Sequence, residues 1–339
     1  MDNFWLKSLK RNIVMKYMGF SSNRSLGKPK DCSIDLLQDP ISMAMRKLSY
    51  RVMSFLNEIV ENVYPINSLL SDSLEMLKIM SFNILCEDKS SNEHDWRLRK
   101  KYIASIVRFH KLDVIGFQEP FMPQVLDLKQ LLFEFDWCGV GADDGKNKGF
   151  INAIFYKKSR FDLLESSSFF LSDTPNKPSK GWDSSFNRTV TWAKFYDKKT
   201  KKTFFFFNTH FDYYGEEARN NSAMLIRKKI SEIANDYPFV VTGDFNLFPT
   251  LGGGDTYKLL TSKVKNTKSL IDAQKSTFFP HHGPTGTWSG FKEAGQPGIK
   301  PDYIFVGKNV KVINHGILAD TFDGRFPSDH LPVIAEINI

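Results

Sequence analysis

The sequence contains little cysteine. Only Cys32, Cys86 and Cys138 occur among its 339 residues. They form no C-x-x-C pair, and an odd number of cysteines does not make a disulfide framework. We therefore exclude the small disulfide-stapled class and expect folding in a reducing, cytoplasmic compartment, although the sequence leaves the localisation itself open.

Long hydrophobic runs are also missing. No apolar stretch approaches the roughly 20 residues that span a bilayer. Near the N-terminus, Lys7, Lys10, Arg11 and Lys16 interrupt the region where a signal peptide would have its apolar core. Internal repeats and low-complexity tracts are absent as well. We expect neither a membrane-spanning helix nor a repeat architecture.

Acidic residues are outnumbered, with 38 Asp and Glu against 46 Lys and Arg, for a net charge of +8. This balance favours anionic partners such as phosphate esters, nucleic acid or membrane surfaces, although it also serves solubility alone. Apolar residues, in contrast, are plentiful at 41%, and Phe alone occurs 30 times. The composition is that of a folded chain with a large core.

The first 76 residues form a predicted N-terminal helical extension. Apolar residues recur every three or four positions over residues 40–63, which predicts an amphipathic helix with Asp39 as its cap. One apolar stripe needs a partner surface. We expect it to pack on the following domain or, through residues 1–63, to contact a membrane surface or a protein. Nothing indicates an obligate oligomer.

Residues 77–339 alternate between the periodicities of strands and helices. Strands are predicted at 77–83, 112–117, 151–156, 161–170, 189–195, 203–208, 239–241, 301–306, 310–317 and 332–339, and helices at 95–110, 123–133, 216–236 and 257–261. Many strands with a few long helices indicate packed sheets flanked by helices.

Polar side chains gather at the ends of five predicted strands. They are Asn83, Glu119, Asn208-Thr209-His210, Asp244-Phe245-Asn246, and Asp302 together with Asp329-His330. Loops at strand ends often carry function. Carboxylates with Asn and no Cys suit a hard cation such as Mg²⁺ or Mn²⁺, and a His beside carboxylates suits acid–base chemistry or charge stabilisation.

Taken one at a time, these residues have purely structural alternatives. Asn83, Asn246 and Asp329 suit turns. Glu119 suits an ordinary strand-end charge, and His210 suits a hydrogen-bonded core histidine. The catalytic interpretation therefore depends on all of them occurring together.

Six short motifs follow one another along the chain: Met80–Asn83, Gly116–Glu119, Asn208–His210, Gly243–Asn246, Pro301–Ile304 and Ser328–Val333. The series resembles that of the endonuclease/exonuclease/phosphatase superfamily and covers about residues 77–339. Each motif alone is weak, whereas six in order are specific. The resemblance implies an α/β fold in which two packed, mostly antiparallel β-sheets form a sandwich flanked by helices. It also implies metal-dependent phosphoester hydrolysis.

The resemblance gives each motif residue a role. Glu119 matches the main metal-binding carboxylate, with Asn83 beside it and Asp329 as a further carboxylate near the Mg²⁺ or Mn²⁺. Asp244 matches the group that orients or deprotonates the attacking water. Together these residues suit metal-assisted attack on phosphorus.

The remaining roles concern the phosphate group. Asn246 and His210 match groups that hold phosphate oxygens, and Asp302 matches the carboxylate that hydrogen-bonds the catalytic His330. Arg188 matches a phosphate-contacting arginine, although a surface arginine at a strand start is an equal alternative.

The motif details favour one branch of the superfamily. The sequence at residues 208–212 differs from the Tyr-containing loop of AP endonucleases, and Leu247-Phe248-Pro249 lacks the Arg of inositol polyphosphate phosphatases. The segments 181–183 and 187–193 look closer to bacterial metal-dependent hydrolases that resemble the deadenylase and nocturnin-like branch.

The predicted function is Mg²⁺-dependent hydrolysis of a phosphodiester or phosphomonoester, in nucleic acid, a phospholipid head group or a small phosphate. The alternatives are specifically a 3′-exonuclease on RNA or DNA, and a catalytically silent binding or adaptor protein on the same fold. Residues 278–298 contain His281, His282 and Trp288. Because no third zinc ligand is near, we predict a substrate-side loop there.

Overall fold

The computed structural model describes residues 76–87, 94–248, 252–265 and 267–339. The predicted helix at 40–63 and all but the last residue of the predicted extension lie outside the described residues. The domain division at 76/77 and the contacts of residues 1–63 therefore remain predictions. Within the described part of the chain, no helix is both long and apolar enough to cross a membrane.

The described chain folds into two β-sheets and their covering helices. In chain order the elements are β1 (Leu77–Asn83), α3 (Trp96–Phe109), β2 (Val114–Gln118), α4 (Met122–Leu131), β3 (Phe135–Cys138), β4 (Ala153–Lys157), β5 (Phe161–Phe170), β6 (Thr189–Asp197), β7 (Lys202–His210), α5 (Glu216–Ala234), β8 (Phe239–Asp244), α6 (Gly253–Thr261), β9 (Ile271–Asp272), α7 (Ala273–Ser276), β10 (Asp302–Val306), β11 (Lys311–Ile317) and β12 (Val333–Asn338).

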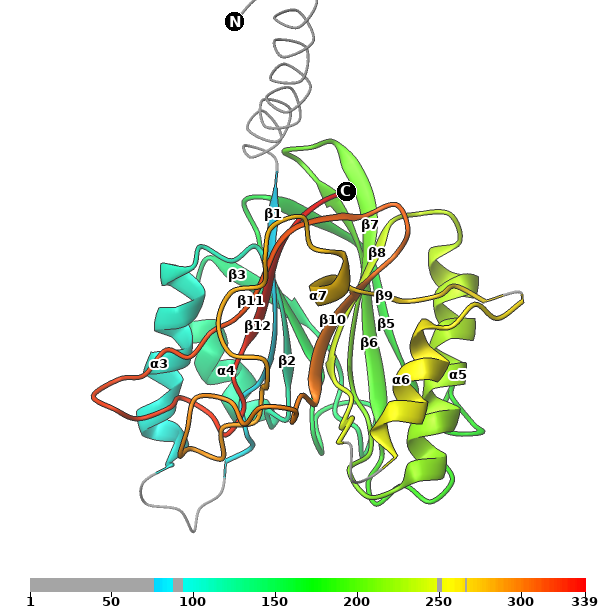
Figure 1. The fold of residues 1–339 in the computed structure, drawn as a ribbon, viewed down its shortest axis with the longest axis horizontal. Helices are drawn as coiled ribbons and strands as arrows, with labels where there is room; N and C mark the ends of the chain where they lie inside the picture. Colours follow the sequence, from blue (N-terminus) through cyan, green and yellow to red (C-terminus); the bar gives the residue numbers. More distant parts are fainter. Residues whose placement is uncertain (1–75, 88–93, 249–251, 266) are drawn as a thin grey trace, which may run out of the picture. The chain divides into compact units, whose positions relative to one another are not determined.

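Each sheet has six strands. Their orders are β11-β12-β1-β2-β4-β3 and β5-β6-β7-β8-β10-β9. Eight of the ten strand pairings are antiparallel. The sheets stand face to face, with α3 and α4 covering the outside of the first and α5 and α6 the outside of the second (Figure 1). The predicted sandwich of mostly antiparallel sheets is confirmed.

The four consecutive phenylalanines of β7 show how the layers are specified. Side chains alternate between the faces of a strand. Phe204 and Phe206 enter the core between the sheets, whereas Phe205 and Phe207 join the core beneath α5 and α6. A strand that is buried on both faces needs an uninterrupted apolar run, and that is what the sequence provides.

Three short elements escape the sequence prediction. The strands β3 and β9 have four and two residues and lie at sheet edges. The helix α7 is a single turn of four residues capped by the Asp272 side chain. Such short segments carry too little periodicity to be found without the neighbours that complete them.

Two parallel strand pairs bring the polar strand ends together. β1 pairs with β2 so that Asn83 lies opposite Gln118, and β7 pairs with β8 so that His210 lies opposite Asp244. Each pair is joined by a helical crossover, α3 or α5. All four strands therefore end at the same edge of the sandwich, where the antiparallel β10 begins with Asp302 opposite Asp244.

Candidate active site

Two carboxylates and an amide form the centre of this edge. The Asn83 Nδ2 group donates to Glu119 Oε1 at 2.8 Å and to Asp244 Oδ2 at 3.0 Å. The second Glu119 oxygen accepts the backbone N–H of Cys86 at 3.2 Å. Asn83 and Asp244 are buried, and the Glu119 side chain is 17% exposed. The first and second sheets thus contribute to one buried acidic cluster.

The backbone turns sharply at two of these strand ends. Glu119 and Asn246 adopt positive φ angles of 73° and 51°. Non-glycine residues rarely adopt this left-handed conformation, and it is enriched at functional sites. The Asn246 N–H donates to Asp244 Oδ1 at 3.0 Å, which fixes the turn after β8. The Asx-turn that the residue types favour is therefore present, and it holds the carboxylate in place.

A second chain of contacts runs through His330. Its Nδ1 lies 2.8 Å from Asp302 Oδ2, and the same oxygen accepts the Thr287 hydroxyl at 2.6 Å. The other ring nitrogen, Nε2, lies 3.8 Å from Asp244 Oδ2. The contact between Asp302 and His330 that the resemblance implies is present, and the other ring nitrogen of His330 faces Asp244.

His210 and Asn246 lie on the other side of Asp244. His210 Nε2 is 3.3 Å from Asp244 Oδ2 and 3.1 Å from Asn246 Nδ2. Its Nδ1 is buried and has no hydrogen-bond partner among the described residues. An unpaired buried nitrogen is costly unless a ligand satisfies it, so the alternative of a fully satisfied core histidine is disfavoured.

The environment sets unusual protonation states. Burial, and then the neighbouring Asp302 charge, raise the pKa of Asp244 to about 6. Burial and the nearby Asp329 charge also raise the pKa of Glu119. Burial alone would lower the pKa of His330, but the surrounding Asp302, Asp244 and Asp329 raise it well above its ordinary value.

His210 shows the opposite behaviour. Burial, followed by the positive charges of Arg188 and His330, lowers the pKa of His210 well below its ordinary value. The two histidines on either side of Asp244 therefore differ: burial favours the neutral form of His210, whereas the surrounding acids favour the cationic form of His330. Groups whose environments push their pKa values apart are typical of acid–base sites.

Arg188 and Asp329 stand at the border of this cluster. The Arg188 side chain is buried and its Nε donates to Asp212 Oδ1 at 3.2 Å. Asp329 is half-buried and accepts the Ser328 hydroxyl at 3.2 Å. It acts on Glu119 and His330 through its charge but belongs to neither of the two tight groups of three ligand atoms, Glu119–His210–Asp244 and Asp244–Asp302–His330.

A polar bridge between the sheets lies directly beneath the site. Asn208 Oδ1 accepts Gln118 Nε2 at 2.7 Å and the Thr242 hydroxyl at 3.0 Å. Its Nδ2 donates to two backbone carbonyls of the first sheet. A Cβ atom on Gly116 would come within 2.1 Å of the Thr242 hydroxyl, so only glycine fits the sheets this close together. Sequence reasoning found Asn208 as a motif residue but not its role as a bridge.

The donor set fits a hard divalent cation. Glu119, Asp244 and Asp302 supply carboxylate oxygens, and His210 or His330 completes each of the two groups of three potential ligand atoms. Oxygen-rich sites of this kind suit Mg²⁺ or Mn²⁺ better than Zn²⁺. Of the residues predicted to hold the ion, Glu119 belongs to one of the two groups of potential ligand atoms, Asn83 is its hydrogen-bond partner, and Asp329 belongs to neither group, so the predicted ligand set remains a prediction.

The strand-end site residues and most of the two-sheet fold lie within a region that matches a known protein family. Residues 80–330, well over half of the chain, match the model of the Endonuclease/Exonuclease/phosphatase family. The chain belongs to this family. Its motifs and its two-sheet fold are those expected of a family member.

Solved structures agree with this membership. An endonuclease/exonuclease/phosphatase from Bacteroides vulgatus superposes with a TM-score of 0.73 at 36% identity, covering 78% of this chain and 99% of that one. The mannosyl-6-phosphatase Bt3783 of Bacteroides thetaiotaomicron gives 0.72 and 36%, covering 78% and 100%. The human nocturnin catalytic domain is similar in fold, with a TM-score of 0.55 at 19% identity, covering 78% and 93%.

The loop at residues 278–298 contacts the candidate active site at Asp302 and His330. It supplies Thr287 to Asp302, and the Trp288 ring meets the His330 ring edge-on at 5.0 Å. His281 is occupied elsewhere, because its Nδ1 pairs with His315 Nδ1 at 2.9 Å and its Nε2 lies 2.8 Å from the Pro284 carbonyl oxygen. In the described residues, neither of the two groups of three potential ligands includes His281 or His282.

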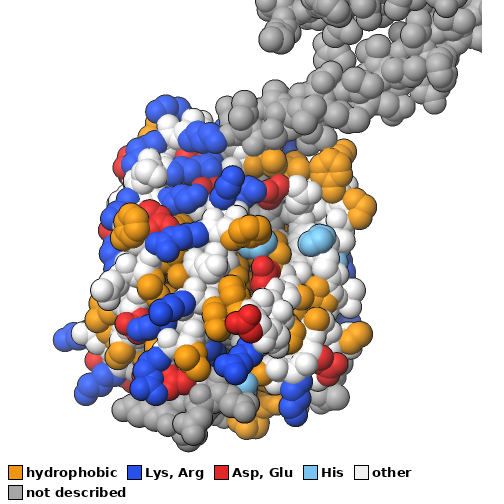
Figure 2. Space-filling view, turned by 90° about the vertical axis from the view of Figure 1, so that its left-hand side faces the viewer, with side chains coloured by type: hydrophobic (Ala, Val, Ile, Leu, Met, Phe, Trp, Pro, Cys, Tyr) orange, Lys and Arg blue, Asp and Glu red, His pale blue; other side chains and the backbone are white. Residues whose placement is uncertain are grey.

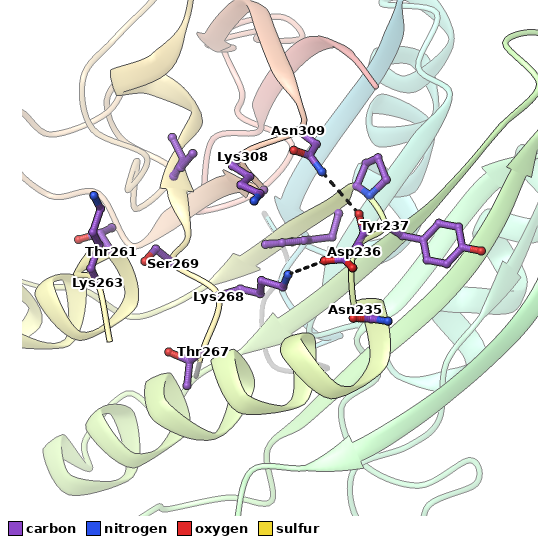
Figure 3. A pocket seen from close by; sticks show the side chains of 14 residues that line it. Asn235, Asp236, Tyr237, Thr261, Lys263, Thr267, Lys268, Ser269, Lys308 and Asn309 are labelled. Atoms are coloured by element: carbon purple, nitrogen blue, oxygen red, sulfur yellow. Dashed lines mark hydrogen bonds and ion pairs between the residues drawn. The ribbon is translucent and has the colours of Figure 1, made fainter. Parts of the chain in front are cut away.

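A separate cavity of about 450 Å³ lies at the opposite end of β8. It is lined by Pro238, Lys263, Lys308 and neighbouring residues, and Lys268 forms an ion pair with Asp236 across it at 3.5 Å (Figure 3). The site residues predicted from the sequence do not line this cavity. The candidate active site lies at the carboxyl end of β8, where Asp244 stands.

Proposed function

We propose that this protein is a Mg²⁺-dependent phosphoester hydrolase. The observation that carries the proposal is the environment of Asp244. This single buried carboxylate stands between the acidic Glu119–Asn83 pair and two histidines of opposite protonation preference. Such a constellation suits attack by water on a phosphoester and has no evident structural purpose.

Asp244 is the group that orients the water and accepts its proton. Its raised pKa, about 6, places it near neutrality, where a general base is most effective. Water oxygen then bonds to phosphorus, the bond from phosphorus to the leaving oxygen breaks, the water proton resides on Asp244, and the leaving oxygen takes a proton from solvent to give the alcohol. A Mg²⁺ ion bound by Glu119, with Asn83 and Asp329 beside it, would add positive charge next to the phosphate.

The remaining residues hold the phosphate group. Cationic His330, fixed by Asp302, stabilises the negative charge that develops on the phosphate oxygens. Neutral His210 and the Asn246 amide contact further oxygens, which would occupy the unpaired His210 Nδ1. Arg188 completes the phosphate site from the second sheet, where its hydrogen bond to Asp212 holds the side chain.

A small phosphomonoester is the substrate class that has most support. The similarity to a mannosyl-6-phosphatase extends over the whole length of that protein at 36% identity. Figure 2 shows the side of the molecule that carries α3, where Lys and Arg side chains are interspersed with acidic, uncharged and hydrophobic ones. The candidate active site lies at the strand ends and not on this side, so the preference for a phosphomonoester rests on the similarity.

A hydrolysis panel tests the proposal. We expect phosphate release from mannose 6-phosphate in Mg²⁺, its loss in EDTA and its recovery when Mg²⁺ or Mn²⁺ is restored. Single-stranded RNA, DNA, phosphoinositides and glycerol 3-phosphate are compared in the same assay. Glu119→Gln should lose the response to Mg²⁺, whereas Asp255→Asn, at an exposed carboxylate on α6, should keep it.

The panel separates the alternatives. Trimming of RNA or DNA from the 3′ end without monoester turnover would replace the phosphatase by an exonuclease. Activity that persists in EDTA would contradict the metal site. Failure to hydrolyse any substrate, with Mg²⁺ still raising the melting temperature, would favour a binding protein on the same fold.

A further inference from the structure

A continuous set of aromatic side chains leads outward from His330. The Trp288 ring contacts His330 at a centroid distance of 5.0 Å, Phe248 follows at 6.3 Å from Trp288, and Tyr213 at 5.4 Å from Phe248. Tyr214 packs edge-on against Tyr213 at 4.7 Å. We call Tyr213, Tyr214, Phe248 and Trp288 the aromatic wall. It begins at a residue of the catalytic cluster and ends in solvent.

The outer end of the wall is exposed, although large aromatic rings are usually buried. Tyr213 is 41% and Tyr214 is 70% exposed. Neither hydroxyl group has a hydrogen-bond partner within the described ranges of the chain. Exposed aromatic rings grouped beside a polar site are typical of ligand-binding surfaces.

The tyrosine pair is held rigidly from below. Asp212 Oδ2 accepts the N–H of Tyr214 at 3.2 Å and of Gly215 at 2.9 Å. Arg219 is fully buried and donates to the Tyr213 carbonyl oxygen at 2.6 Å. Because Asp212 also binds Arg188, the proposed phosphate contact and the tyrosines are fixed by the same residue. These contacts hold the backbone of Tyr213 and Tyr214 in place beside Arg188 before any ligand binds.

We propose that the aromatic wall is the subsite for the leaving group, and that it selects a pyranose ring esterified to phosphate. This inference rests on the proposed function for the position of the phosphate. A pyranose has an apolar face of C–H groups and a rim of hydroxyls. Aromatic rings cover the face, while the polar edges of Tyr213, Tyr214 and Trp288 can hydrogen-bond the rim. An acyclic leaving group offers no such face.

Steady-state kinetics with the full chain and Mg²⁺ test the subsite. The double variant Tyr213→Ala/Tyr214→Ala should raise KM for mannose 6-phosphate about tenfold, the effect of losing roughly 55 Å² of apolar contact, with kcat within twofold. Hydrolysis of glycerol 3-phosphate should change less than twofold. The control Tyr237→Ala removes a tyrosine of similar exposure, 46%, beside the remote cavity (Figure 3) and should alter neither substrate.

Binding without turnover separates this inference from the proposed reaction. Calorimetry with Ca²⁺ in place of Mg²⁺ should show tighter binding of mannose 6-phosphate than of glycerol 3-phosphate, and the double variant should lose this preference. Ring-selective binding with no hydrolysis in Mg²⁺ would refute the reaction and support the wall. Equal binding of both compounds, or equal losses on both in the variant, would refute the wall. Stronger selection of adenosine 5′-monophosphate would refute the pyranose assignment.

Discussion

Two buried clusters of charge lie at opposite ends of the same sandwich. At one end, Glu119, Asp244 and Asp302 surround His330 and one another. At the other end, Arg160 donates to Asp113 at 2.8 Å and to Asp197 at 2.9 Å. Both clusters are largely removed from water, and both join the first sheet to the second. They differ in how the negative charge is neutralised.

The cluster around Arg160 is satisfied from within the protein. Asp197 also accepts the Lys199 N–H at 2.9 Å and the Thr200 hydroxyl at 3.0 Å. Burial alone would raise the pKa of Asp197, but these hydrogen bonds and the Arg160 charge keep it below its ordinary value. In contrast, burial and neighbouring acids raise the pKa of Asp244. The acids of one cluster are thus neutralised within the protein, whereas those of the other are not, as the proposed cation-binding site requires.

The largest predicted effect is that of replacing Asp244, which should change catalysis strongly but not reduce stability. Asp244→Asn should lower kcat for mannose 6-phosphate by at least about 10³-fold, because it removes the proton acceptor. In EDTA its free energy of unfolding should equal or exceed that of the wild type, since acidic repulsion is relieved. Phosphate release and urea unfolding measure the two quantities. Wild-type turnover in this variant would contradict the role of Asp244.

The matching change in the other cluster should do the reverse. Asp197→Asn leaves Arg160 with less compensation, and it should cost about 3–5 kcal/mol of stability at pH 7. Because the pKa of Asp197 is lowered by folding, its contribution is present above pH ~4 and is lost as pH falls further. Urea unfolding between pH 7 and 3 should therefore show the two proteins converging. If kcat fell by more than the fraction of folded protein, Asp197 would also affect catalysis, which would contradict the contrast between the two clusters.

Two glycines test how closely the sheets must approach beneath the site. Gly116→Ala places a methyl group against Thr242 and Asn208 and should cost about 1–3 kcal/mol of stability and reduce activity with it. Gly254→Ala on α6 meets no atom within 4 Å and should be neutral or stabilise by about 0.5–1 kcal/mol. Thermal unfolding compares the two. Equal effects would show that the inter-sheet contact is not tight.

The smallest effect concerns two threonine hydroxyls that each bind a buried aspartate. Thr287→Val removes the donor to Asp302, should lower kcat about tenfold and should leave KM nearly unchanged, because His330 is less firmly oriented. Thr200→Val removes the donor to Asp197 and should cost about 0.5–1.5 kcal/mol of stability without a change in kcat. Kinetics and unfolding of both variants check the contrast. Equal changes of kcat and of stability in Thr287→Val and Thr200→Val would contradict the contrast between the two hydroxyls.

The two-sheet sandwich and most of the residues that meet at the site could be predicted from the sequence. Strands such as β5 were predicted at their observed bounds, because buried runs and polar strand ends are local signals. The motif residues Asn83, Glu119, His210 and Asp244 do meet. Their chemical roles remain proposals.

Other features depend on contacts between distant segments. Thr287 binds Asp302 from a loop without regular periodicity, and Gly116 matters only because Thr242 stands opposite it. The opposite protonation preferences of His210 and His330 follow from which acids and cations surround each ring. A pattern of residue types along one chain does not contain this information.

The position of β12 has a consequence for biosynthesis. This strand lies between β11 and β1, so that Lys78 pairs with Glu336, and His330 comes just before it. A ribosome makes β1 early and β2 soon after it, but the second neighbour of β1 is missing until residues 333–338 emerge. Chains that end before residue 330 therefore lack both β12 and His330. The proposed hydrolysis would therefore be confined to chains whose translation has passed residue 330.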